Sequence, residues 1–346
     1  MLSLSNSNPV LYLKSHIFNS TVSAAKLAEK NPTPDNILFA QRLIGSKNSP
    51  NNPKLSEKVI YNIREMARSE KYKELFLRVN ANDFKKLNQY SAELETKNNH
   101  VNVDRIERYR DIKTAKDSQI KLKNGTCMPA NQIKADGKNV AIRCQYPKPA
   151  FLNDHFQMLL EQKPAVLVVL SSDNDISARK LPAYFRGDVE GNYGGIKVNC
   201  SRRIDKNNQE TAVTQLDSLQ LKHYRMNISD KENNLNLSVI HITNWEDKKT
   251  ITPDELKKLT SVVKNKVEEK CKDNTKLTKQ PLIHCSAGVG RTGMLIGALQ
   301  LTDEKNQKSV REIVQMMRET GSPRMVQTAE QYNTLQQLAI SLKSDR

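Results

Sequence analysis

The chain has 346 residues, of which 37% are hydrophobic and 27% charged, and its formal net charge is +17 at pH 7. This length and composition indicate one large domain, or a domain with an extension. The charge favours anionic partners such as phosphorylated groups, nucleic acid or an acidic membrane surface, although a chain rich in Lys and Asn reaches the same charge through composition alone. No apolar run approaches the roughly 18 residues that span a bilayer, so we expect no membrane segment.

Residues 1–54 are rich in Ser, Asn and Pro and end in SKNSPNNPK. This composition is typical of a weakly structured leader and linker, in which only residues 20–30 have helical character. The leader lacks a basic region followed by an apolar core, so we expect no Sec-type signal peptide. Residues 55–346 have the pattern of a folded domain, which opens with apolar residues at helical spacing, Val59, Ile63 and Met66.

Hydrophobic periodicity places strands and helices along this domain. Residues 165–170, AVLVVL, are wholly apolar, which is typical of a strand buried on both faces. Residues 234–243 alternate as a half-buried strand does. The last segment places apolar side chains on one helical face, namely Tyr332, Leu335, Leu338, Ala339 and Leu342. Strands and helices mixed in one pattern, without an internal repeat, predict a single α/β (α+β) domain.

Two helix starts are predicted by capping boxes. Thr252 is followed three residues later by Glu255, with Pro253 at the first helical position. Ser309 and Glu312 repeat the spacing.

The cysteines are odd in number and scattered, at Cys127, Cys144, Cys200, Cys271 and Cys285. No CxxC pair and no histidine cluster with zinc-ligand spacing occurs, so we expect free thiols, a reducing compartment and no metal site.

Residues 284–293, HCSAGVGRTG, join a predicted strand to a helix that begins near Arg291. A glycine-rich loop that leads into a helix N-terminus directs backbone N–H groups and the helix dipole at one point, which is a site for an oxyanion such as phosphate. The loop is no Walker A motif, because the lysine is missing and a cysteine stands at its start. The N–H groups that we expect to bind phosphate belong to Ser286, Ala287, Gly288, Val289, Gly290 and Arg291.

Cys285 is the candidate nucleophile. In such a setting the pKa of a thiol falls from about 8.5 to roughly 3.5–7.5, so we expect a thiolate facing the bound phosphate. Arg291 is placed to hold two phosphate oxygens and to stabilise the charge that develops on them. The Thr292 hydroxyl would assist departure of the sulfur. A lone cysteine beside a capping loop is usually structural, but the complete set of residues favours catalysis.

This string resembles the signature of the cysteine-based protein tyrosine phosphatases, in particular their classical branch. The likeness extends over roughly residues 60–343, through CQYPKPAFLNDHF, YFRGDVEGNYGG and MVQTAEQY, and within the branch it is strongest to a bacterial effector secreted by a type III system. The resemblance implies one catalytic domain at 55–346, built as a twisted mixed sheet flanked by helices, with 1–54 as a short N-terminal extension.

The resemblance also implies roles for residues outside the glycine-rich loop. In RYRDI, residues 108–112, Tyr109 would stack on the substrate ring and Asp111 would hold the peptide backbone. Asp175 takes the place of an acidic residue that orients the signature arginine, with Lys180 five residues later. The family usually has Glu at that position, so the shorter Asp is expected to hold the arginine less firmly.

The general acid is implied to be Asp247, in a loop where the family has Trp-Pro-Asp. Here Trp245 and Asp247 are present, but Glu246 replaces the proline. Loss of proline frees the φ angle that it fixed, so we expect a working enzyme with altered loop kinetics. Gln327 and Gln331 would position the hydrolytic water. His284 is implied to support the loop without touching substrate.

The resemblance implies no cofactor and no metal. It implies tyrosine-phosphorylated proteins, of a host cell, as substrates, with residues 1–54 as a type III export signal that includes a chaperone-binding stretch. The protein would then be secreted into the host cytoplasm, and otherwise be cytoplasmic. No nucleic-acid partner is expected, because no RNA-binding motif is present and aromatic residues are only 5%.

Two alternatives stay open. Glu246 and Asp175 allow a catalytically impaired phosphotyrosine-binding module. The signature alone allows a dual-specificity or phosphoinositide phosphatase, although such enzymes generally lack counterparts of Tyr109 and of the glutamine-containing loop.

Overall fold

The computed structural model describes residues 70–97, 99–187, 190–202 and 213–344. The leader and the domain start that the sequence predicts lie outside these ranges. By its internal contacts the chain divides into two compact units. One unit is formed by residues 84–338, and the other by residues 1–83 together with 339–346. Every residue that the sequence proposes for the site lies in unit 84–338, which is described by itself below.

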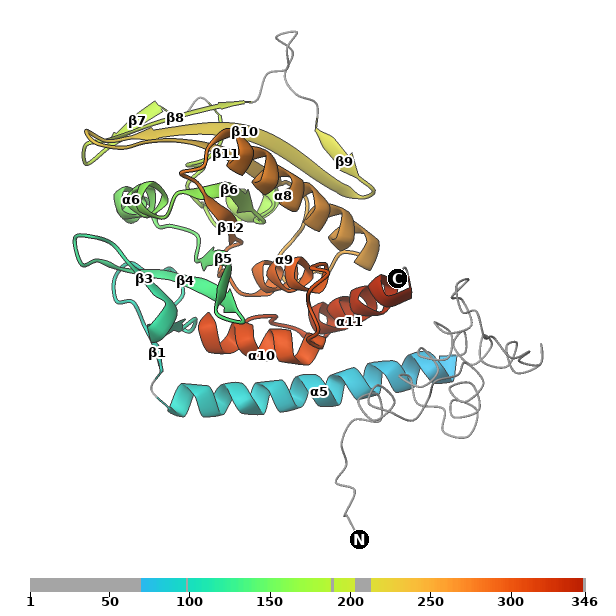
Figure 1. The fold of residues 1–346 in the computed structure, drawn as a ribbon. Helices are drawn as coiled ribbons and strands as arrows, with labels where there is room; N and C mark the ends of the chain where they lie inside the picture. Colours follow the sequence, from blue (N-terminus) through green and yellow to red (C-terminus); the bar gives the residue numbers. More distant parts are fainter. Residues whose placement is uncertain (1–69, 98, 188–189, 203–212, 345–346) are drawn as a thin grey trace. The chain divides into compact units, whose positions relative to one another are not determined.

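A ten-stranded mixed sheet forms the centre of this unit (Figure 1). The strand order is β3-β4-β5-β12-β6-β11-β10-β8-β7, and β9 pairs with β10. The neighbours β5, β12, β6 and β11 run parallel, and the remaining pairs are antiparallel. The strands are β3 (Gln119–Lys121), β4 (Cys127–Ala135), β5 (Lys138–Cys144), β6 (Pro164–Val169), β7 (Glu190–Tyr193), β8 (Ile196–Arg202), β9 (Thr214–Leu216), β10 (Leu219–Ser229), β11 (Asn234–Ile242) and β12 (Thr278–His284). A separate two-stranded sheet pairs β1 (His100–Val101) with β2 (Thr114–Ala115).

Helices pack on this sheet. Helix α8 contacts β6 and β12, α9 contacts β5 and β12, α10 contacts β4, and α6 contacts β4, β8, β10 and β11. In the described residues the α-helices are α5 (Glu70–Thr96), α6 (Leu152–Gln162), α7 (Asp173–Ala178), α8 (Pro253–Asp273), α9 (Gly290–Leu301), α10 (Val310–Thr320) and α11 (Ala329–Ser344). Short 3-10 turns occupy Lys116–Ser118 and Pro149–Phe151. The predicted mixed α/β architecture is confirmed.

The core forms around the parallel strands. Every residue of β6 is buried, as the wholly apolar run predicted for a strand covered on both faces. In β11, Leu235 and Leu237 are buried while Asn234 and Asn236 are exposed, which confirms the predicted alternation in the first half of the strand. In the second half it is wrong, because residues 239–242 are all buried. Because β12, β6 and β11 are parallel neighbours, the loops that follow them leave the sheet at one edge. The glycine-rich loop, the segment that contains Asp175 and the loop that contains Trp245 are therefore brought together.

Both predicted capping boxes are confirmed. The Thr252 hydroxyl accepts a hydrogen bond from the Glu255 backbone N–H, and the Glu255 carboxylate accepts one from the Thr252 N–H. Ser309 and Glu312 make the same reciprocal pair at the start of α10.

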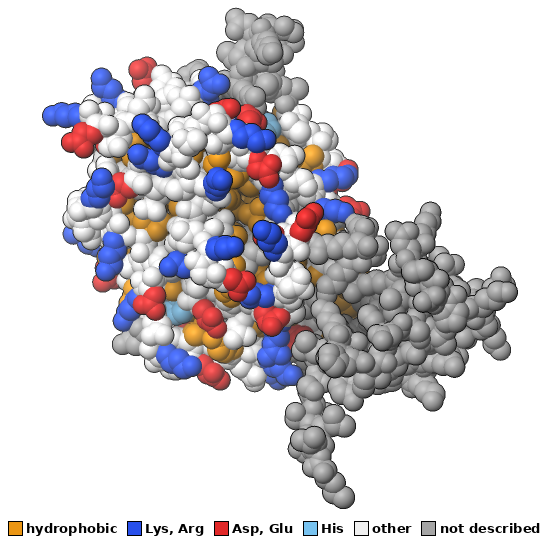
Figure 2. All heavy atoms as spheres, in the orientation of Figure 1, with side chains coloured by type: hydrophobic (Ala, Val, Ile, Leu, Met, Phe, Trp, Pro, Cys, Tyr) orange, Lys and Arg blue, Asp and Glu red, His pale blue; other side chains and the backbone are white. Residues whose placement is uncertain are grey.

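The surface that Figure 2 shows carries Lys and Arg side chains scattered among Asp and Glu, without a continuous basic stripe across the described part of that face. Extended basic stripes are typical of proteins that follow a nucleic-acid backbone. In the described ranges, none of the helices has both the length and the apolar character needed to cross a membrane.

We expect Thr252→Ala to lower the free energy of unfolding by about 1 kcal/mol, because it removes the side-chain acceptor for the first turn of α8. Urea denaturation followed by far-UV circular dichroism measures the change. Thr250→Ala is the matched control, since Thr250 is exposed in the preceding loop. Equal stability of the two variants would contradict the assigned cap.

Candidate active site

The glycine-rich loop joins β12 to α9, and α9 begins at Gly290, as the sequence predicted to within one residue. Leu282 and Ile283 are fully buried in the centre of the sheet, so the core fixes the point at which the loop begins. Gly288 has a φ of +73°, and a Cβ added there would lie 2.1 Å from the Cys144 carbonyl oxygen. The loop therefore passes so close to the end of β5 that only glycine fits.

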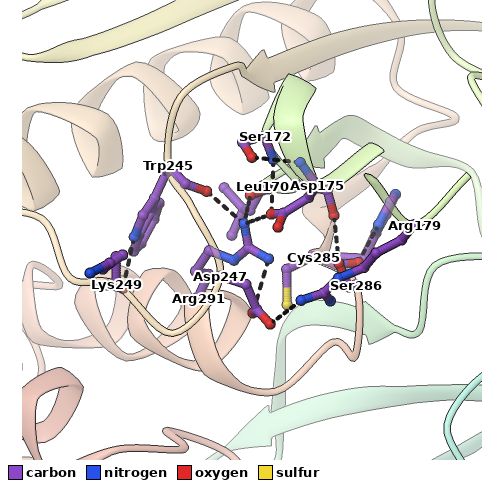
Figure 3. Close-up of polar contacts among 12 residues, drawn as sticks. Leu170, Ser172, Asp175, Arg179, Trp245, Asp247, Lys249, Cys285, Ser286 and Arg291 are labelled. Atoms are coloured by element: carbon purple, nitrogen blue, oxygen red, sulfur yellow. Dashed lines mark hydrogen bonds and ion pairs between the residues drawn. The ribbon is translucent and has the colours of Figure 1, made fainter. Parts of the chain in front are cut away.

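Arg291 is the most constrained side chain of the site (Figure 3). Its side chain has no exposed area. One terminal nitrogen, NH1, donates to the carbonyl oxygens of Leu170 at 2.8 Å and Trp245 at 2.6 Å, and to Asp175 Oδ2 at 2.5 Å. The other, NH2, donates to Asp247 Oδ1 at 3.1 Å. Its Nε is buried and has no partner among the described residues.

Asp175 orients Arg291 from the first turn of α7. Its own backbone N–H donates to the Ser172 hydroxyl at 3.0 Å, and its Oδ2 accepts from the Ser172 N–H at 3.3 Å, which makes a capping box. The capping box therefore holds the Asp175 carboxylate in position independently of Arg291. The sequence predicted a weaker hold than Glu would give, yet the Asp reaches the guanidinium at hydrogen-bond distance.

The loop that follows β11 contributes Trp245 and Asp247. Trp245 is buried, and its indole N–H donates to the Lys249 carbonyl oxygen at 3.0 Å. Asp247 binds Arg291 through one oxygen, and its Oδ2 accepts from NH2 of Arg179 at 2.7 Å. Burial alone would raise the pKa of Asp247, but the hydrogen bond from Arg179 and the charges of both arginines outweigh it, so the pKa lies below its ordinary value.

Tyr109 is half-buried, and its hydroxyl lies 3.4 Å from NH1 of Arg179. Its backbone N–H donates to Gln145 Oε1 at 2.8 Å, and Gln145 Nε2 donates back to the Tyr109 carbonyl oxygen at 3.1 Å. The buried Gln145, which the sequence analysis missed, therefore sets the position of this segment. Asp111 is exposed, and Oδ2 of its carboxylate accepts from Arg324 at 2.7 Å.

Both glutamines of the predicted glutamine loop lie against the glycine-rich loop. Gln331 is fully buried, and its Oε1 accepts from the Gln327 backbone N–H at 2.9 Å. A Cβ added at Gly290 would lie 3.0 Å from Gln331 Nε2 and 3.3 Å from Gln327 Oε1. The segment is held from behind by buried Arg318, which donates to the Met325 and Val326 carbonyl oxygens.

His284 directly precedes the nucleophile candidate in the chain, and Thr292 lies in the first turn of α9. His284 is buried, and its ring nitrogens lie 3.0 Å from the Cys285 carbonyl oxygen and 2.6 Å from the Tyr184 hydroxyl. Burial lowers the pKa of His284 to about 4, against the opposing bond to that carbonyl, so the ring is neutral near pH 7. Cys285 is 2% exposed. The Thr292 hydroxyl is buried without a partner among the described residues.

The structure does not bring Lys180 into this group. Lys180 is exposed with a φ of +48°, and its backbone N–H donates to the Ser177 carbonyl oxygen. The preceding residue, Arg179, reaches Asp247 instead. In the sequence, Arg179 is distinguished only as one of two adjacent basic residues, Arg179 and Lys180. This pair does not indicate which of the two side chains points toward Asp247.

Three buried donors at this site lack partners among the described residues: Arg291 Nε, Thr292 Oγ1 and Gln331 Nε2. All three belong to α9 or to the segment packed against its first turn. Buried donors are normally satisfied, so an unpartnered group of this kind beside a helix N-terminus fits an absent oxyanion. In the part of the chain that the structure describes, no three His, Cys, Asp or Glu residues gather as a metal site would require.

A family model described as protein-tyrosine phosphatase matches residues 103–341. The secreted effector protein SptP of Salmonella typhi is 33% identical over 229 residues, which cover 65% of this chain and 40% of SptP. The tyrosine-protein phosphatase YopH of Yersinia enterocolitica is 33% identical over 251 residues, which cover 68% of this chain and 50% of YopH. The chain thus spans half or less of the length of these relatives.

Solved structures show the same fold. The catalytic domain of human protein tyrosine phosphatase non-receptor type 18 is similar with a TM-score of 0.61 at 17% identity, over 77% of this chain and 96% of that domain. PTPN18 in complex with HER2 phosphopeptides gives a TM-score of 0.63 at 18% identity, over 77% and 93% of the two chains.

We expect Gly288→Ala to destabilise the protein more than Gly125→Ala does. Both glycines have positive φ, which costs an alanine about 1–2 kcal/mol, but only the Gly288 Cβ meets the Cys144 carbonyl, whereas nothing lies within 4 Å at Gly125. Thermal unfolding of both variants measures the difference, and equal melting temperatures would contradict the close approach.

Proposed function

Because this chain belongs to the protein-tyrosine phosphatase family, we propose that it hydrolyses phosphotyrosine in proteins through a cysteinyl-phosphate intermediate. The observation that carries the proposal is the buried Arg291, whose Nε is unpartnered among the described residues beside buried Cys285. Leaving a charged donor unsatisfied in the interior costs several kcal/mol. A phosphate group would remove that cost with a bidentate pair to Nε and NH2.

Substrate binding would use the glycine-rich loop and the half-buried Tyr109. The phosphate would accept hydrogen bonds from the backbone N–H groups of residues 286–291 and from Arg291, at the positive end of α9. The ring of Tyr109 would stack on the phosphotyrosine ring, held in place by Gln145. This wall favours a long aromatic phosphoester over phosphoserine, which supports tyrosine specificity over the dual-specificity and phosphoinositide alternatives.

In the first step the Cys285 thiolate would attack phosphorus in line with the tyrosine oxygen. The new S–P bond forms as the P–O bond to tyrosine breaks, and Asp247 gives its proton to the departing phenolate oxygen. Arg291 stabilises the negative charge on the equatorial oxygens during the transfer. Tyrosine leaves, and the phosphoryl group stays on the sulfur.

In the second step a water held by Gln327 and Gln331 would attack the phosphorus. The Asp247 carboxylate takes the water proton, the S–P bond breaks, and the Thr292 hydroxyl donates to the departing thiolate. Inorganic phosphate leaves and Asp247 is again protonated. The position of Gln331 Nε2 at Gly290 supports this role, because that amide faces the loop and has no other partner in the described residues.

We further propose that the protein acts as a bacterial effector exported by a type III system into host cytoplasm, where host phosphotyrosine proteins are its substrates. The support is the likeness to SptP and YopH, of which the first is named a secreted effector. Residues 1–54 would supply the export signal and a chaperone-binding stretch.

The placement of Asp247 favours the enzyme over a phosphotyrosine-binding module that has lost catalysis. Although Glu246 replaces the loop proline, Asp247 still lies 3.1 Å from Arg291, the residue proposed to bind phosphate. A binding module needs no acid at that position.

We expect steady-state hydrolysis of a phosphotyrosyl peptide by the full chain, abolition of turnover by Cys285→Ser, and a ~10²–10⁴-fold lower kcat for Asp247→Asn, the contribution of a general acid. Asp117→Asn and Cys127→Ser, changed on the surface and on β4, should behave as wild type. Phosphoseryl peptide and phosphoinositide should be poor substrates. A wild type that binds the peptide yet is as inactive as Cys285→Ser would establish the binding module instead.

A further inference from the structure

Arg179, which follows the last residue of α7, extends toward Asp247 (Figure 3). Its NH2 donates to Asp247 Oδ2 at 2.7 Å, and its NH1 lies 3.4 Å from the Tyr109 hydroxyl. The other oxygen of Asp247 accepts from Arg291. The carboxylate is therefore held from two sides, and only one of its two cations belongs to the phosphate site.

Arg291 and Arg179 would respond differently to a bound phosphate, because only Arg291 would exchange its bond to Asp247 for a bond to phosphate. Phosphate would occupy the Arg291 fork that now binds Asp247, and its negative charge would repel the Asp247 carboxylate. Arg179 stands outside the fork and keeps its bond. It is also free of the buried contacts that commit Arg291 to Leu170 and Asp175.

The loop that carries Asp247 is held at Trp245 and Lys249, and it lacks the proline that would fix the φ angle of residue 246. A cavity of about 520 Å³ lies beside it, lined by Trp245, Glu246 and Lys249 together with the start of α8. Glu246 is exposed, and it does not fix the φ angle at its position, whereas a proline there would. The contacts of the Asp247 side chain are therefore a further restraint on the position of the loop.

We propose that Arg179 is a positioning residue that holds Asp247 over the phosphate site independently of Arg291, so that the loop stays closed when substrate phosphate takes the Arg291 fork. The inference rests on the proposed role of Asp247 as the general acid. The Tyr109 hydroxyl orients the guanidinium, which couples the ring-stacking wall to the acid-bearing loop.

The charged and titratable groups around Asp247 set the sign of the pH effect. Arg179 faces it from the end of α7 and Arg291 from α9, with Tyr109 behind the first and Asp175 behind the second. Cys285 lies in the loop beneath (Figure 3), and Glu246 and Lys248 flank Asp247 in sequence. Arg179 lowers the pKa of Asp247. Because the first step needs Asp247 protonated, removing Arg179 should shift the fall of kcat at high pH to a higher pH.

Loop position can be measured without catalysis, because Trp245 is the only tryptophan of the chain. In a Cys285→Ser background, we expect Arg179→Ala to raise acrylamide quenching of Trp245, because loss of a partly exposed ion pair shifts the closed–open equilibrium of the loop about two- to fivefold. The increase should persist with tungstate as the bound oxyanion. Lys258→Ala, which breaks an ion pair of similar length with Asp217 on the surface, should leave quenching unchanged. Unchanged quenching in Arg179→Ala, with native circular dichroism, overturns the proposal.

Turnover supplies the second readout. We expect Arg179→Ala to lower kcat about two- to fivefold with little change in KM. The variant should also shift the fall of kcat at high pH to a higher pH. Arg179→Lys should return that fall to its wild-type pH, because the positive charge is restored. Adding Arg179→Ala to Asp247→Asn should cause no further loss, since the effect passes through Asp247. Superimposable pH profiles, or additive losses in the double variant, overturn the proposal. An inactive wild type whose Trp245 still responds to Arg179→Ala refutes the proposed function and leaves the positioning role of Arg179 intact.

Discussion

A guanidinium that has no contact with solvent must be surrounded by acceptors, because the interior does not tolerate an unpaired charge. Arg291 meets that demand with the carbonyl oxygens of Leu170 and Trp245 and the carboxylates of Asp175 and Asp247. These acceptors come from the segments that follow β6 and β11, while the arginine itself follows β12. Satisfying one buried cation therefore fixes three separate loops against each other, and only Nε is left without a partner among the described residues.

The sheet makes this convergence unavoidable. Parallel strands end at the same edge, so the loops after β12, β6 and β11 meet wherever their sequences allow. Close packing then removes the remaining freedom. Gly288 passes against the end of β5, and the buried Arg318 holds the backbone that leads to Gln327 from the opposite side. The glycine-rich loop and the segment that contains Gln327 are therefore both anchored in buried structure.

The loop that carries Asp247 differs, because part of its restraint is electrostatic. Trp245 anchors its start in the core, but Asp247 is held by two guanidinium groups that are themselves on different elements. An ion pair is weaker and more easily exchanged than a fixed φ angle, which suits a segment that must admit substrate and release product. In the proposed role of Arg179, charge would supply closure where a proline is absent.

Some of this was determined by sequence alone, where the chemistry is local. The nucleophile candidate, its arginine and the glycines between them lie within ten residues, and both capping boxes within four, so spacing along the chain fixes their geometry. Likewise, the wholly apolar sequence of β6 is enough to predict that the strand is buried. The tertiary structure alone decided the contacts that span long separations. Arg179 rather than Lys180 meets Asp247 across 68 residues, Gln145 holds Tyr109, and Asp111 pairs with Arg324. Such pairs depend on strand order and on which way each side chain points as it leaves the sheet, and no local pattern encodes either.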